Sequence, residues 1–141
     1  MNEFRTQLGA LIDEMLASGL RPAFLRIDLD GAEEIKAAHG AESLEKFKTA
    51  VINAVSTATD GADAFTYGDD RVIAILDDSW DRLRTFAMIH KLRRQIPFLG
   101  QSFDCFLRPD FDVIEYRDDQ GLNGVITMLT RPRPTTDEDV A

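Results

Sequence analysis

Two acidic clusters stand beside apolar segments of this 141-residue chain. The first cluster, Asp28-Leu29-Asp30-Gly31, directly follows the apolar segment 23–27. The second cluster, Tyr67-Gly68-Asp69-Asp70, directly precedes the segment 71–76. If both segments are neighbouring strands, carboxylates at a strand end and at a hairpin tip meet at one edge of the sheet. Carboxylates so placed can bind the divalent metal ions that neutralise phosphate charge and activate the attacking oxygen in nucleotidyl transfer.

Composition limits the classes of protein to which the chain can belong. A chain of this length can bury one core, and 44% hydrophobic with 29% charged residues is ordinary for a soluble globular domain. A formal net charge of −9 would repel a phosphate backbone, so we expect no nucleic-acid partner. No apolar stretch reaches the roughly 20 residues of a membrane helix, so we expect no membrane partner. The first residues lack a signal-peptide pattern and Cys105 has no second cysteine, which predicts a reducing, cytoplasmic setting.

Apolar periodicity places the two clusters in an order of helices and strands. It predicts helices at about 3–18, 32–39, 42–57 and 79–96, and strands at about 23–27, 64–66, 71–76, 102–107, 112–116 and 124–129. The last helix is expected to begin after an N-cap at Asp78 or Ser79 and to end before Pro97. This order predicts an α/β (α+β) domain whose mixed, mostly antiparallel sheet is covered by helices. We expect an N-terminal amphipathic helix at 1–20, the domain at 21–130 and a disordered acidic tail at 131–141.

The strand with its Asp28-x-Asp30 cluster, the two helices and the Gly68-Asp69-Asp70 hairpin resemble, in this order, the GGDEF domain of diguanylate cyclases. The resemblance implies a single palm-like domain, and an activity that joins two GTP molecules into cyclic di-GMP. It implies that Asp28, Asp69 and the backbone carbonyl of Leu29 bind Mg²⁺. Asp70 then occupies the next acidic position of the hairpin signature, so the catalytic residues of an active enzyme would be Asp28, Asp69 and Asp70.

The resemblance also indicates which residues would face a GTP-type nucleotide. Lys36 stands where the family reads guanine with an asparagine. Glu45 is the ungapped counterpart of a second guanine contact, although a gapped alignment on 40–44 is equally open. Gly68 allows the backbone to approach the phosphates, whereas Tyr67 replaces the first glycine of the signature and places a side chain there.

Other positions depart from the family pattern. Arg71 replaces an apolar residue, and Ala32-Glu33 replaces the usual Phe-Lys. The segment 59–63 lacks the Arg-x-x-Asp motif of product inhibition. The chain after Pro97 is short, and 121–125 resembles the family's terminal Gly-Arg-Asn-x-Val without its arginine. These departures indicate a degenerate, C-terminally shortened GGDEF-like domain.

We therefore expect a non-catalytic regulatory or protein-interaction module of a bacterial signalling system, which retains weak nucleotide or Mg²⁺ binding at most. The alternative is an active metal-dependent nucleotidyl cyclase of altered base specificity, which would work as a homodimer because two nucleotides must face each other. A third reading is a small haloacid-dehalogenase-type phosphatase, since 24–31 also resembles the first motif of that family.

Structural explanations of the same residues remain open beside these. Asp30 can cap a helix, and Asp69-Asp70 can simply form a turn. The basic helix at 79–96 is either a solvated face or a docking surface for an acidic partner. The N-terminal helix either forms a dimer or packs on its own sheet.

Overall fold

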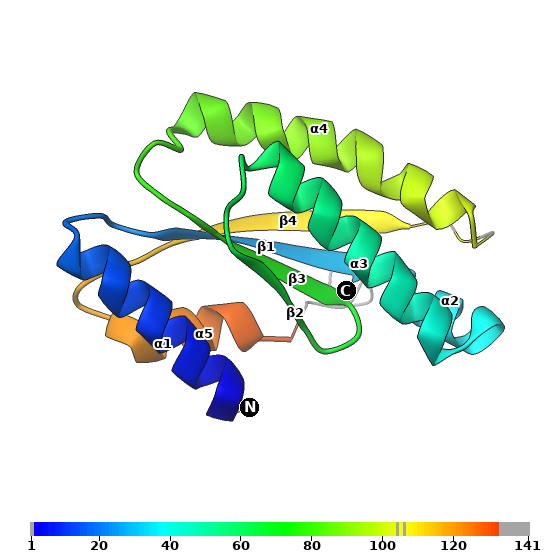
Figure 1. Cartoon of the computed structure of the whole chain (residues 1–141), viewed down its shortest axis with the longest axis horizontal. Coiled ribbons are helices and arrows are strands. Elements are labelled where there is room, and N and C mark those ends of the chain that lie inside the picture. Colours follow the sequence, from blue (N-terminus) through cyan, green and yellow to red (C-terminus); the bar gives the residue numbers. More distant parts are fainter. Residues whose placement is uncertain (1, 104, 106, 133–141) are drawn as a thin grey trace, which may run out of the picture.

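A four-stranded sheet runs through the middle of the molecule, between two layers of helices (Figure 1). The computed structural model describes residues 2–103, 105 and 107–132. The strands, in the order β2-β3-β1-β4 across the sheet, are β1 (Ala23–Asp30), β2 (Ala64–Tyr67), β3 (Arg71–Leu76) and β4 (Arg108–Glu115). The helices are α1 (Asn2–Ala17), α2 (Ala32–His39), α3 (Ala41–Ala58), α4 (Arg82–Gln101) and α5 (Gly121–Thr130). All three strand pairings are antiparallel, and the predicted α/β fold class is confirmed.

The central strand β1 is buried on both faces because helices cover each side of the sheet. Successive side chains of a strand point to opposite faces. Leu25 therefore packs with Phe47 of α3 and Leu92 of α4, and these three side chains are fully buried. Phe24 packs on the other face with Leu8 of α1, and both are also fully buried. The N-terminal helix thus packs on its own sheet.

Helix α4 begins and ends later than its apolar pattern predicts. Its N-cap is Asp81, whose side chain accepts a hydrogen bond from the Arg84 amide, so the predicted caps at Asp78 and Ser79 are wrong. The helix continues through Pro97 to Gln101. A proline removes one backbone donor, but Ile96 and Gly100 are buried on either side of it and hold the last turns against the core. The predicted strand at 102–107 is wrong, because its described residues form no strand.

The end of the chain differs most from the prediction. The predicted strand at 124–129 is wrong, because these residues are part of helix α5. Val125 and Leu129 are four residues apart and both buried, which is the spacing of one helix face. Strand β4 begins at Arg108, earlier than predicted, and contains Pro109. Proline is tolerated there because β4 is an edge strand.

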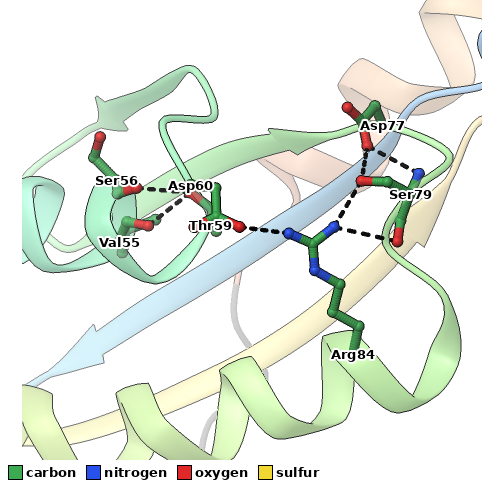
Figure 2. A network of polar contacts seen from close by, with 7 residues as sticks. All are labelled: Val55, Ser56, Thr59, Asp60, Asp77, Ser79 and Arg84. Atoms are coloured by element: carbon green, nitrogen blue, oxygen red, sulfur yellow. Dashed lines mark hydrogen bonds and ion pairs between the residues drawn. The ribbon is translucent and has the colours of Figure 1, made fainter.

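Arg84 joins the beginning of α4 to the end of α3 (Figure 2). Its Nη2 donates to Asp60 Oδ2 at 2.5 Å, and its Nη1 donates to the Ser79 hydroxyl at 2.7 Å. Asp77 accepts from the Ser79 amide and hydroxyl, and these bonds lower the pKa of the Asp77 carboxyl. The Arg84 guanidinium also lies 3.7 Å from the centroid of the Trp80 ring. This network joins α3 to α4, which pack on the same face of the sheet.

Two further predictions concern membrane-spanning helices and the C-terminal tail. Among the described residues, none of the helices has the length and apolar character that crossing a bilayer requires. Residues 133–141 of the predicted tail lie outside the described residues. The tail and the proposed domain boundaries stay predictions.

Candidate functional site

The carboxylate of Asp28, the first predicted metal ligand, is buried between two arginines. Register places Asp28 directly opposite Arg71 of β3, and Arg71 Nε donates to Asp28 Oδ1 at 2.6 Å. Arg26 lies on the same face of β1 and donates from Nε to Asp28 Oδ2 at 3.2 Å. The three side chains are between 5% and 10% exposed, so salt and water screen these ion pairs little. Each carboxylate oxygen of Asp28 already has a cationic partner.

The same two arginines bind the C-terminal end of α5. Arg26 donates to the carbonyl oxygens of Met128 and Arg131, each at 2.7 Å. Arg71 Nη1 donates to the Leu129 carbonyl at 2.8 Å. The last carbonyls of a helix lack intrahelical partners and carry partial negative charge, so cations stabilise this end. The network therefore joins β1, β3 and α5, and the carboxylate at its centre has a structural role.

Two lysines hold the tip of the β2–β3 hairpin. Lys36 of α2 donates from Nζ to Asp69 Oδ2 at 3.0 Å, and this hydrogen bond holds the pKa of the Asp69 carboxyl below its usual value. Lys48 of α3 donates to the Gly68 carbonyl at 3.3 Å and lies 3.1 Å from Glu45 Oε1. Gly68 has a φ of 66°, a left-handed conformation that favours glycine. Of the predicted nucleotide-binding residues, Gly68 is part of the hairpin tip and Lys36 binds the tip directly. Glu45 is linked to the tip through Lys48.

A small acidic pocket of about 160 Å³ lies between the end of β1 and this hairpin. Its lining consists of Asp28, Leu29, Asp30, Gly31, Glu33, Glu34 and Asp70. The Leu29 amide donates to the Asp70 carbonyl at 2.7 Å, which fixes the hairpin beside β1. The structure thus brings Asp28, Leu29 and Asp70 together, whereas the Asp69 carboxylate binds Lys36. Within the described ranges no three His, Cys, Asp or Glu side chains are placed to hold a metal ion. The metal and nucleotide roles of these residues stay predictions.

Arg26 and Arg71 are the features of this site that sequence reasoning did not assign. A signal for them exists, because Arg26 interrupts the apolar run 23–27 and Arg71 begins the apolar strand β3. A buried charge is costly unless it is paired, so such a residue indicates a buried ion pair. For Arg71 the identity of the partner carboxylate depends on the strand register, which the sequence does not show, whereas Arg26 and Asp28 share one face of β1 at a spacing of two residues.

Solved GGDEF domains share this architecture. A sensory box/GGDEF family protein from Caulobacter crescentus CB15 matches with a TM-score of 0.61 and 21% identity, over 89% of this chain and 84% of that one. The GGDEF domain of DgcB from Caulobacter crescentus, in complex with c-di-GMP, gives 0.65 and 14% identity over 87% and 75%. The active GGEEF domain of a diguanylate cyclase from Vibrio cholerae gives 0.58 and 15% identity over 86% and 86%. The chain has a GGDEF-like fold.

This GGDEF-like fold confirms the predicted resemblance and the palm-like architecture of nucleotidyl cyclases. No protein-family model matches the chain, and no curated protein matches it in sequence. Because the identities lie between 14% and 21%, the likeness is one of fold.

Proposed function

We propose that this chain is a degenerate, non-catalytic GGDEF-like module that acts by binding a protein partner in a cytoplasmic signalling system. The single observation that supports the proposal most is the bond between Arg71 and Asp28. The family resemblance expects an apolar residue at position 71 and a metal-bound carboxylate at position 28. Here a guanidinium binds the carboxylate oxygen that Mg²⁺ would need, so the two cations compete for one ligand.

The buried network makes this competition unfavourable for the metal. Mg²⁺ demands nearly octahedral oxygen ligands at about 2.0–2.1 Å. To bind Asp28 it would have to displace Arg71 and Arg26, which would leave two buried cations without a carboxylate partner among the described residues. Breaking a buried ion pair in this way costs about 3–5 kcal/mol. The adjoining pocket of about 160 Å³ is also smaller than the roughly 300–1,000 Å³ of ordinary small-molecule sites.

The surface of α4 supports the protein-binding part of the proposal. Three large apolar side chains, Leu83, Phe86 and Phe98, are 79%, 69% and 66% exposed. Within α4 there are five lysines and arginines and no acidic residue, although the whole chain carries a net charge of −9. Exposed apolar side chains among charges of one sign are typical of a surface that binds another protein.

An active, metal-dependent nucleotidyl cyclase of altered base specificity is the second candidate. Its support is the acidic pocket, which contains Asp28, Leu29 and Asp70 where the family resemblance expects the metal site. In this alternative, binding of a metal–nucleotide complex would have to release Asp28 from both arginines. The phosphatase reading has no support from the GGDEF-like fold.

A turnover experiment distinguishes these functions. The purified chain is incubated with Mg²⁺ or Mn²⁺ and each of the four nucleoside triphosphates, and the products are separated by ion-exchange chromatography. We expect no cyclic product and no release of inorganic phosphate. A metal-dependent cyclic product that disappears in Asp69→Ala would overturn the non-catalytic proposal. Phosphate release that persists in Asp69→Ala and disappears in Asp28→Asn would instead support a phosphatase.

A further inference from the structure

Strand β4 has one free edge, and the register shows which backbone groups point outward there. Tyr116 N–H donates to the Pro22 carbonyl at 3.1 Å, in the same register that pairs β4 with β1. Opposed residues of an antiparallel pair alternate between hydrogen-bonded and non-hydrogen-bonded positions. Phe111, Val113 and Glu115 therefore direct their N–H and C=O groups away from β1, toward the free edge.

Within the part of the chain that the structure describes, this edge is open rather than covered. A groove of about 680 Å³ lies along the second half of β4, and its lining comes from the edge strand and from both helix layers. Phe86 and Ile89 of α4 line it on one face of the sheet, and Met128 of α5 on the other. Val113 lies in the groove and is 38% exposed. The outward backbone groups of Phe111, Val113 and Glu115 have no partner among the described residues, and such an edge strand is a template for pairing with another strand.

We propose that β4 pairs antiparallel with β4 of a second copy of this chain, about a twofold axis at Val113, to form a continuous eight-stranded sheet. In this arrangement Val113 faces Val113 of the other copy, and Phe111 faces Glu115. The pair formed by Phe111 of one copy and Glu115 of the other occurs on both sides of the axis, as a twofold interface requires. The exposed Val113 side chains meet at its centre. This inference does not depend on whether the chain is catalytic.

Charge complementarity favours a second copy as the occupant of this edge. Arg93 of α4 lies with its guanidinium 5.4 Å from the centroid of the Phe111 ring. Directly opposed residues have Cβ atoms about 4.5–5.5 Å apart, and Phe111 and Glu115 point to the same face of the sheet. Glu115 of one copy therefore comes beside Arg93 of the other, and the twofold axis forms this ion pair twice. When the pairing is centred on Val113, neither Asp112 nor Glu115 stands directly opposite an acidic residue of the other copy.

Sedimentation velocity of the full chain, over a concentration series reaching about 100 µM, tests the proposal. We expect a monomer–dimer equilibrium with a Kd in the micromolar range, as for a standard interface of modest size. Val113→Pro removes an outward N–H that β1 does not use, so it should weaken the dimer at least about tenfold while the fold persists. Circular dichroism and the thermal midpoint report whether the fold persists. Phe98→Ser, an exposed apolar residue on α4 outside the groove, is the matched control and should leave Kd unchanged.

A charge swap provides the second, independent readout. Arg93→Glu and Glu115→Arg should each raise Kd by about threefold to thirtyfold, because each removes both symmetric ion pairs. The double variant restores the pairing with reversed sign and should return Kd to within about threefold of the original.

Three results would overturn the proposal. The first is a chain that stays monomeric at every concentration, which would leave the edge to a different protein. The second is a dimer that survives Val113→Pro but is lost in Phe98→Ser, which would place the interface on α4. The third is a dimer that is lost when the chain is truncated after Pro132, with the swap variants unaffected, which would assign the contact to the C-terminal residues.

Discussion

Replacing Asp28 with asparagine removes the central charge of the buried network without creating a cavity. The variant leaves Arg26 and Arg71, each 4–6% exposed, without a carboxylate partner. Removing one member of a buried ion pair costs about 3–5 kcal/mol. Because both guanidiniums keep their bonds to the α5 carbonyls, we expect the lower value, about 3 kcal/mol. The native domain has only about 5–15 kcal/mol in total, so the thermal midpoint should fall by about 10 °C.

Urea unfolding followed by circular dichroism measures this loss, with Asp69→Asn as the matched control. Asp69 is half-exposed and its ion pair with Lys36 is open to solvent, so its substitution should cost no more than about 1 kcal/mol. Arg71→Met combined with Asp28→Asn should destabilise less than the sum of the two single variants, by about 1–3 kcal/mol. A neutral or stabilising Asp28→Asn would refute the reasoning. It would mean that this carboxylate is under repulsion and is kept for binding a cation from outside.

Three further results follow from other contacts. Arg84→Ala should lower the free energy of unfolding by about 1–2 kcal/mol, because it removes the bond to Asp60 and the contact with Trp80. Arg84→Lys keeps the charge and should lower it less. Equal unfolding curves for the original chain and both variants would contradict the role of Arg84 in joining α3 and α4. Lys36→Met should raise the pKa of the Asp69 carboxyl toward its ordinary value, measured by NMR titration. Since the pKa of the Asp69 carboxyl is depressed in the folded state, the contribution of this pair to stability is present above the unfolded pKa and is lost as the pH falls below about 4. An Asp69 titration curve that Lys36→Met leaves unchanged would show that the bond is absent in solution. Leu129→Ala should cost about 2–5 kcal/mol in unfolding experiments because the side chain is fully buried under the sheet, and a cost below 1 kcal/mol would contradict the packing of α5.

The first two thirds of the fold could be predicted because its apolar pattern is strong. The helix at Ala32–His39 and the strand at Arg71–Leu76 are confirmed at both boundaries. The end of the chain could not be predicted as well, because a short apolar segment such as 124–129 suits a buried strand and a helix alike. The four-residue spacing of Val125 and Leu129 favoured the helix, but β-branched residues in the same segment favoured a strand.

The site shows a different limit of sequence reasoning. The order and spacing of the acidic clusters were sufficient to predict the fold and to bring Asp28, Leu29 and Asp70 to one pocket, whereas Asp69, which was expected beside them, pairs with Lys36 instead. The same spacing carries no information on what neutralises Asp28. Arg71 reaches that carboxylate because the β1–β3 register sets the two residues opposite each other. Arg26 stands two residues from Asp28 on the same face of β1, but the carbonyls that complete its bonding come from the distant α5. Long-range pairing of this kind is a property of the folded chain.

The central claim is that arginine, and not a divalent metal ion, neutralises Asp28. The most direct test is a titration with Mn²⁺ while the side-chain Nε–H signals of Arg26 and Arg71 are observed in ¹⁵N-resolved NMR spectra. Mn²⁺ broadens signals of nuclei close to it, so a bound ion at this carboxylate would be evident at once. We predict that both Nε–H signals stay sharp at Mn²⁺ concentrations that broaden the backbone amide signals beside exposed surface carboxylates. A selective loss of the Arg71 signal on addition of Mn²⁺ that no longer occurs in Asp28→Asn would contradict the account.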